Sequence, residues 1–442
     1  MYIAQKLTDM TKTKTLLFFL FISIFSFSQD YKPLDTTDYK HRSFLYNTYD
    51  DDFYAVRKQI KKDYMGKIER AMISSYTRKH ERFLHNLKNK EFVFNPVFTK
   101  YIDSLTKALV DANPSLKAEH LKVHIGRYNA PNAYSMGEGI VVLNMGLFKY
   151  LENESQLVSV LSHEIAHQKL KHSANNILYK AKLLNSKEVK NKAKRIRKQK
   201  YNQYEKAFSV LKDMLYVNSK MHRSQEAQAD KLGYKMYKKT KFNKTAFVNA
   251  LKILSKLDSM PSIELDSTIY KKIFDLPKQA FNAEWIAKTK SKYNYFEEKA
   301  KIDRDSVASH PEIPERIEKL RNVFPELKED VDPTASSGTY KKLQEIAKME
   351  SVTNLYYLKK YGLSTYVLLY RLSNNPENNY YKEWLGKNFK ALAKAKKEYK
   401  FSRYVDNISR ESQDESYQMF LKFLWSLSLD KMNNIGDYYS GE

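Results

Sequence analysis

The stretch LSHEIAHQKLKH, residues 161–172, contains two histidines four positions apart, with a glutamate directly after the first one. Residues four apart lie on one face of a helix, so His163 and His167 can approach the same metal ion. Glu164 is rotated by about 100° from His163, which places it beside that ion but not among its ligands. This H-E-x-x-H pattern is typical of a zinc site with two imidazole ligands and one general base.

The residues around the motif favour a helix. Apolar side chains recur at helical spacing before and between the histidines, and we expect Ser155 to cap the helix start. His172 follows His167 by five positions, which is about 140° around a continuous helix, so we expect it on the surface. The alternative explanation is a chance pair of histidines on a surface helix, which is uncommon in a chain with 10 histidines.

A catalytic zinc ion needs three protein ligands and one open position for water. The chain contains no cysteine, so the third ligand must be a histidine or a carboxylate. The segment EAQAD places Glu226 and Asp230 four positions apart, on one helical face. By itself this segment is a weak indication, because most such pairs are solvated charges on the surface of a helix.

Four segments in this order resemble the HtpX-like and CAAX-prenyl-protease-like family of zinc metallopeptidases. They are NAYSMGEGIVVLNMGLF at 132–148, HEIAH, SQEAQAD around Glu226, and HPEIPERIEKL, which begins at His310. The resemblance covers roughly residues 95–325 and is greatest to the soluble, exported BepA-like branch. The membrane-spanning segments of the HtpX-like branch have no counterpart here, which argues against prenylated peptides as substrates.

The resemblance implies a role for each matched residue at the metal. His163, His167 and Glu226 would bind one Zn²⁺ per chain. Glu164 would take a proton from the zinc-bound water, which then attacks a peptide carbonyl. Asp230 would hold the second ring nitrogen of a ligand histidine.

The resemblance also implies residues around the metal that meet the substrate. A strand containing Asn132, Ala133 and Tyr134 would form the edge on which an extended peptide adds as a further strand. Arg316 and His310 would lie near the metal. His310 would either stabilise the oxyanion or occupy the open zinc position as a gate, and the alternative is a structural histidine before a proline turn.

The secondary-structure pattern predicts an α+β fold that is mainly α, with a zincin-type metallopeptidase domain built on a small sheet and the H-E-x-x-H helix. Amphipathic spacing predicts a helix over 94–113 and one or two helices within 50–87. Alternating apolar residues predict strands within 120–128 and around 139–143. A helix over 219–238 would carry Glu226.

The first residues resemble an export signal. Lys12 and Lys14 precede the apolar run LLFFLFISIFSF at 16–27, and small residues lead up to a cleavage site after Ser28. The run is shorter than the roughly 20 residues that span a bilayer. We therefore expect an exported, soluble, periplasmic or otherwise extracytoplasmic protein, with an uncleaved anchor as the alternative. Without cysteine, disulfides and a lipoprotein anchor are excluded.

We expect four regions along the chain. They are a signal peptide at 1–28, a helical N-terminal extension at 29–94, the zinc metallopeptidase domain at 95–330 and a helical accessory domain at 331–442. Within the last region, residues 371–389 resemble one tetratricopeptide unit, although Lys382 stands where that repeat has tryptophan. These C-terminal helices would suit contacts with protein partners.

The net charge of +26 is spread along the chain, and no nucleic-acid-binding motif accompanies it. We expect no nucleic-acid partner and interpret most lysines as solvated helix faces. The densest basic segment, at 191–201, is either such a face or a contact with an anionic membrane or an acidic partner.

Two functions from different classes follow from these patterns. The first is a zinc metalloendopeptidase that acts on misfolded or unassembled cell-envelope proteins. The second is a zinc-containing chaperone or assembly factor of the envelope, with little or gated proteolysis. An intact Glu164 favours the enzyme, whereas a gate at His310 and partner-binding C-terminal helices would favour the chaperone.

Overall fold

The computed structural model describes most of the chain beyond residue 30. The described residues are 31–199, 201, 203–258, 263–287, 313–328, 335–409 and 413–441. The predicted signal peptide and His310 lie outside them. The described residues form two compact units. The larger unit takes in those between 35 and 358 other than 263–287, and the smaller unit takes in 31–34, 263–287 and those from 359 onward.

The larger unit contains a four-stranded mixed sheet with the strand order β1-β2-β4-β3. The strands are β1 (Phe92–Val93), β2 (Lys122–Gly126), β3 (Ala133–Gly137) and β4 (Ile140–Asn144). β2 and β4 run parallel, whereas β1 and β3 each run antiparallel to their neighbour, so β3 is one edge of the sheet. The predicted fold class, mainly α with a small sheet, is confirmed.

The tight turn between β3 and β4 is held from outside the sheet. Gly137, Glu138 and Gly139 all have positive φ angles, of 97°, 54° and 80°. A side chain at Gly139 would meet the backbone oxygen of Glu119 at 2.7 Å, so this turn needs glycine there. Lys79 donates to both carboxylate oxygens of Glu138, at 2.8 and 2.9 Å. The turn is thereby fastened to the N-terminal helices.

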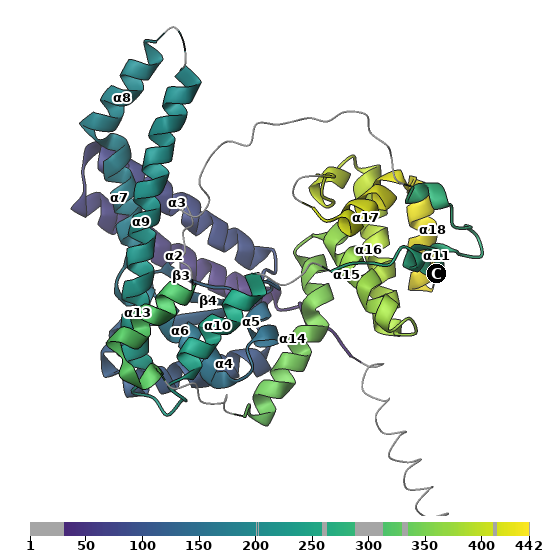
Figure 1. Ribbon diagram of the computed structural model, residues 1–442, viewed down its shortest axis with the longest axis horizontal. Helices are drawn as coiled ribbons and strands as arrows, with labels where there is room; N and C mark the ends of the chain where they lie inside the picture. The colour runs from purple at the N-terminus through teal and green to yellow at the C-terminus, as the bar shows by residue number, and fades with distance from the viewer. Residues whose placement is uncertain are drawn as a thin grey trace, which may run out of the picture. The chain divides into compact units, whose positions relative to one another are not determined.

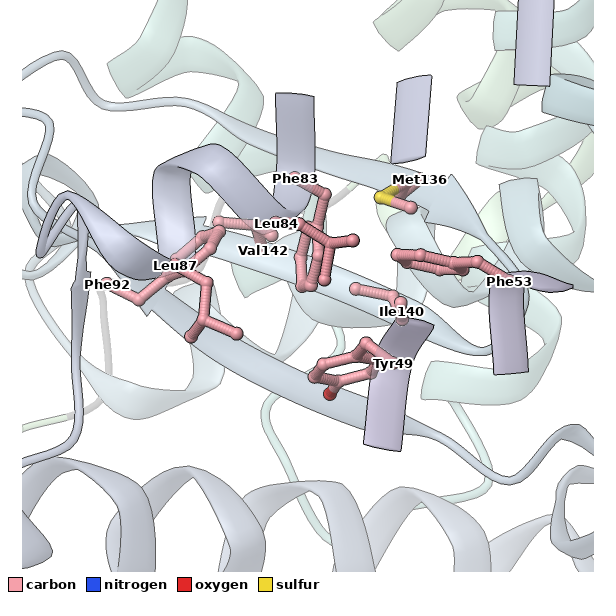
Figure 2. Packing of buried hydrophobic residues seen from close by; sticks show 9 residues of the cluster. All are labelled: Tyr49, Phe53, Phe83, Leu84, Leu87, Phe92, Met136, Ile140 and Val142. Carbon is pink, nitrogen blue, oxygen red and sulfur yellow. The ribbon is translucent and has the colours of Figure 1, made fainter. Parts of the chain in front are cut away.

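Two N-terminal helices, α2 (Tyr39–Asp63) and α3 (Gly66–Lys88), pack against the sheet (Figure 1). They confirm the prediction of one or two helices within 50–87. Figure 2 shows their apolar residues meeting those of the strands. This buried cluster consists of Tyr49, Phe53, Phe83, Leu84, Leu87, Phe92, Met136, Ile140 and Val142. Each fully buried side chain of this size contributes about 1.5–3 kcal/mol of transfer free energy, which ties the N-terminal helices to the edge strand.

The helix that carries H-E-x-x-H is α6 (Glu154–Lys169), which packs against β3 and β4. Its N-cap is Asn153, whose side chain accepts a hydrogen bond from the backbone N–H of Gln156. The prediction that Ser155 caps this helix is therefore wrong. Asn153 has the extended backbone that an N-cap requires, whereas Ser155 already lies within the first turn and is buried.

Three helices follow α6 in the larger unit. They are α7 (His172–Asn185), α8 (Lys187–Arg197) and α9 (Gln203–Tyr237). Figure 1 shows α8 lying beside the first part of α9, as a helical pair that extends away from the sheet. The second part of α9 packs against α6. Although α9 has 35 residues, neither it nor any other described helix is long and apolar enough to cross a membrane.

The remaining helices of the larger unit cover α6 and the loop regions around it. They are α4 (Pro96–Ala112), α5 (Met145–Tyr150), α10 (Ala246–Asp258), α13 (Ile313–Val323) and α14 (Gly338–Tyr357). α10 packs on α6, α13 packs on α9 and α10, and α14 packs on α5. Arg127, fully buried at the end of β2, donates to the side chain of Asn354 on α14. α14 is thus part of the larger unit.

The smaller unit is helical in its described residues. Its α-helices are α11 (Thr268–Phe274), α15 (Tyr361–Asn374), α16 (Asn379–Lys397), α17 (Glu415–Ser426) and α18 (Leu429–Ser440). α15 and α16 form a helical hairpin, as one tetratricopeptide unit would, and this repeat assignment stays a prediction. α16 and α18 can approach closely because residue 386 is a glycine. A side chain at Gly386 would meet Ser440 Oγ at 2.7 Å.

Candidate active site

The structure brings three predicted metal ligands together. His163 and His167 project from α6 with their Nε2 atoms 3.1 Å apart. Glu226 on α9 faces both rings, with Oε2 at 3.5 Å from His163 Nε2 and Oε1 at 3.4 Å from His167 Nε2. Two imidazoles and one carboxylate form a donor set that zinc prefers. The donors around a tetrahedral zinc ion stand about 3.3 Å apart, so the three residues fit this ion.

The close packing of α6 against α9 places Glu226 opposite the histidines. Gly233 lies two helical turns after Glu226, directly against the backbone of His163. A side chain at Gly233 would approach His163 Cα to 3.0 Å. Ser162 reinforces this contact, because its hydroxyl donates to the carbonyl of Gly233. The glycine therefore sets how near the carboxylate can come to the rings.

The outer nitrogen of His163 faces a buried ion pair. Asp230 Oδ1 lies 2.9 Å from His163 Nδ1, as the resemblance implied. Arg316 on α13 donates to both oxygens of Asp230 and lies 3.2 Å from Glu226 Oε2. Burial lowers the pKa of His163, but Asp230 and Glu226 outweigh it and raise that pKa to about 10. The carboxylates therefore favour a proton on this ring.

The outer nitrogen of His167 faces a different partner. His172 Nδ1 lies 2.9 Å from His167 Nδ1, and His172 Nε2 lies 3.2 Å from Gln228 Oε1. Burial, together with the positive charge of His163, lowers the pKa of His167 to about 3. The partner of this Nδ1 is thus an imidazole, whereas that of His163 is a carboxylate, so the two histidines differ in their surroundings.

The prediction of a surface position for His172 is wrong, since only 4% of its surface is exposed. The angular argument assumed one continuous helix. Instead, Lys171 takes up a left-handed conformation with φ 54°, which ends α6 and turns the chain back. His172 then begins α7 beneath His167. The third histidine of the quoted stretch was the sequence signal for this contact.

Glu164 points from α6 toward the edge strand. It is 9% exposed, and the nearby backbone N–H of Ser135 on β3 favours its charged form. Burial raises the pKa of Glu164, and the opposing effects of His163 and Ser135 do not cancel this rise. The carboxylate is therefore more basic than an exposed glutamate. Ser135 was not singled out in the sequence, because only the register of β3 brings it here.

A cleft of about 860 Å³ runs along these residues, between β3 and helices α6, α9, α10 and α13. Ala133 and Tyr134 lie in β3, whereas Asn132 precedes the strand and accepts from the N–H of Ala133 through its side chain. All three line the cleft. The backbone N–H of Asn144 on β4 donates to the carbonyl of Asn132 at 2.9 Å, so by alternation Tyr134 also faces β4, while Ala133 and Ser135 turn their backbone groups to the outer edge. The carbonyl oxygens of Ala133 and Ser135 face this edge, whereas the N–H of Ala133 already donates to the side chain of Asn132.

Comparisons with known proteins agree with this geometry. Residues 97–323 match the sequence profile described as "Peptidase family M48". Over 82 residues, 19% of this chain, it is 38% identical to the beta-barrel assembly-enhancing protease of Yersinia pestis, covering 17% of that relative. Over 80 residues it is 41% identical to the protein of that name from Escherichia coli (strain K12), covering 16% of it. The chain thus matches less than a fifth of each relative's length.

Proposed function

The chain belongs to peptidase family M48 and is a metallopeptidase, and from this premise we propose that it is a zinc-dependent endopeptidase of cell-envelope proteins. One observation carries the proposal. The donor atoms of His163, His167 and Glu226 converge on one point, and Glu164 lies between that point and the open edge of β3. A base, a metal site and a substrate strand are then within reach of one another.

His163, His167 and Glu226 are the proposed ligands of one Zn²⁺ ion. When bound, zinc would supply Lewis acidity toward a water molecule and toward the substrate carbonyl. Asp230, held by Arg316, would keep the proton of His163 on Nδ1 and leave its Nε2 bare. His310, outside the described residues, remains the proposed oxyanion donor or gate.

Glu164 is the proposed general base. Its raised pKa suits proton transfer near neutral pH better than that of an exposed glutamate. It would take the proton of the attacking water and pass it to the amine that leaves. The backbone N–H of Ser135 on the edge strand favours the charged form of this carboxylate.

Extended peptides are the proposed substrates, paired with the outer edge of β3 at Asn132, Ala133 and Tyr134. Pairing of this kind needs an extended segment with unpaired backbone groups, which misfolded or unassembled proteins expose, and this supports them as the substrate class. The names of the two relatives, which refer to the assembly of beta-barrels, support envelope proteins in particular. An export signal at 1–28 and an extracytoplasmic location belong to the same proposal.

Two surfaces are proposed to meet other partners. The helices of the smaller unit, with the hairpin of α15 and α16, would contact proteins. The basic segment at 191–201, which overlaps α8, would contact an anionic membrane surface. A separate unit of paired helices in the same chain also suits the second function, a chaperone or assembly factor with little or gated proteolysis.

Digestion of an unfolded outer-membrane protein by the purified protein tests the enzyme directly. We expect cleavage by the zinc-loaded wild type and a loss of about 10²–10⁴-fold in rate for Glu164→Gln. The exposed Glu188→Gln on α8 is the matched control and should cleave normally. Equal cleavage by wild type and Glu164→Gln would overturn the assignment of the base. Zinc binding without any cleavage would favour the chaperone.

A further inference from the structure

The two histidines of the proposed metal centre are supported by partners of different charge. Asp230, an acidic side chain paired with Arg316, stands behind His163. Behind His167 stands the imidazole of His172, followed by the amide oxygen of Gln228 on α9. The second arrangement is a hydrogen-bonded series of three side chains, His167, His172 and the exposed Gln228, and each of them can be uncharged.

We propose that His172 is a positioning residue that holds His167 in the tautomer whose Nε2 is free to bind the metal, and that Gln228 fixes the tautomer of His172. The proposal rests on the proposed function, in which His167 is a ligand. His172 does not touch the metal or the substrate. It acts through the ring that it orients.

The direction of these hydrogen bonds follows from the amide group of Gln228. An amide oxygen accepts but cannot donate, so His172 Nε2 must carry a proton toward Gln228. A neutral imidazole then has a bare Nδ1, which accepts from Nδ1 of His167. His167 therefore keeps its proton on Nδ1 and presents a bare Nε2 toward Glu226, at 3.4 Å.

The geometry suits a permanent contact. The rings of His167 and His172 meet edge to face, with centroids 4.8 Å apart and planes at 78°. His172 is buried at the start of α7, and the left-handed Lys171 determines where it lies. A side chain held by the backbone in this way restricts rotation of the His167 ring.

The charge of the centre explains why an imidazole is used here. Glu226, Glu164 and Asp230 supply three negative charges, and Arg316 supplies one positive charge. A divalent cation makes this set neutral. A carboxylate behind His167 would leave an excess negative charge in a buried site, whereas His172 supplies the acceptor without one.

Zinc affinity, measured by competition with a chromophoric chelator, tests the proposal with His172→Phe and Gln228→Leu. Loss of a partner behind a ligand histidine typically weakens metal binding about 10–100-fold. We expect a loss in this range for His172→Phe and a smaller loss for Gln228→Leu. The exposed His85→Phe on α3 should bind zinc like the wild type.

Cobalt substitution gives a second readout that does not depend on activity. We expect the visible absorption of the Co²⁺ protein to change in His172→Phe, because the ring of His167 can then rotate. His172→Gln retains an acceptor and should recover part of the affinity. Wild-type affinity and an unchanged spectrum in His172→Phe would overturn the proposal.

Failure of the proposed function gives a different result, because the wild type itself would then bind no zinc at the three ligands. Circular dichroism of the metal-free proteins shows whether each variant folds. If His172→Phe does not fold, Gln228→Leu decides, since its side chain is exposed. Wild-type zinc affinity together with an unchanged Co²⁺ spectrum in Gln228→Leu would then overturn the proposed role of His172 and Gln228.

Discussion

Arg316 donates two hydrogen bonds to Asp230 inside the larger unit, at 2.8 Å from Nε to Oδ2 and at 2.7 Å from Nη2 to Oδ1. The two residues lie in different helices, α13 and α9, and both are buried. Their pair joins α13 to the candidate metal centre. It also sets the charge that faces His163.

The Arg316→Met variant should be strongly destabilised. Removing one partner leaves the carboxylate of Asp230 buried without its counter-ion, which costs about 3–5 kcal/mol. The free energy of unfolding of the metal-free protein in urea measures this loss. Lys238→Met breaks the exposed pair with Glu326 and serves as the control, with an expected loss below about 1 kcal/mol. Similar losses in both variants would contradict a structural role for the buried pair.

The Lys79→Met variant should loosen the edge strand. Lys79 donates to Glu138 and to the carbonyl of Met136, and these bonds fasten the turn after β3. We expect a loss of about 1–3 kcal/mol in stability and a higher KM for peptides, with zinc affinity unchanged. Lys67→Met, an exposed change on the same helix, is the control. An unchanged KM would show that the turn does not position the substrate edge.

The Gly233→Val variant should weaken zinc binding. The added side chain would press on the backbone of His163, because even a Cβ atom at position 233 would lie only 3.0 Å from His163 Cα. α6 and α9 must then separate, and Glu226 moves away from the two histidines. Chelator competition should show a loss of tenfold or more, by analogy with other changes just behind metal ligands. Gly338→Val, at a site with no neighbouring atom within 4 Å, should leave the affinity unchanged.

The stability of the protein should fall as the pH drops from 6.5 toward 4, in part through His124. Burial, with the nearby charge of Lys122, lowers the pKa of His124 from 6.5 to about 4. Between these values the unfolded chain binds a proton that the folded protein does not, so stability increases with pH and is lost in acid. The full shift corresponds to about 3 kcal/mol.

Urea unfolding at pH 7 and pH 4.5 measures this contribution. The His124→Gln variant should show a flatter pH dependence than the wild type, because glutamine does not titrate. His85→Gln, at an exposed position on α3, should keep the wild-type slope. If His124→Gln also kept that slope, the imidazole of His124 would bind a proton equally well in the folded and the unfolded protein.

The helix α8 should bind anionic membranes. None of its residues is buried, and its basic side chains lie around the helix except on a narrow face formed by Val189, Ala193 and Ile196. Vesicles with phosphatidylglycerol should bind the protein more tightly than vesicles of phosphatidylcholine alone. Each basic residue near such a surface contributes about 1 kcal/mol, so replacing Lys194, Arg195 and Arg197 by glutamine should weaken binding about 100-fold.

The control for α8 replaces the same number of exposed lysines elsewhere. Lys58, Lys61 and Lys62 on α2 meet this requirement. If their replacement by glutamine weakened vesicle binding equally, net charge rather than α8 would cause it. High salt should abolish the binding in either case, because it screens charges at the surface.

Patterns within one element were predictable from the sequence. The helical repeat alone places His163 and His167 on one face, with Glu164 beside them. Alternating apolar residues indicated β2 and β4, and amphipathic spacing indicated the helices on either side. Family resemblance, not spacing, singled out Glu226 and Asp230 among many similar surface pairs.

Only the tertiary structure decided which ligand histidine Asp230 holds and what stands behind the other one. His172 reached the site because one left-handed residue broke the helix, and a count of degrees along a helix cannot contain that break. Ser135 and Gly233 matter through the register of a strand and the spacing of two helices. The sequence determined which groups can bind a metal and move a proton. The packing of α6, α9 and β3 determined their distances, because those contacts join residues far apart in the chain.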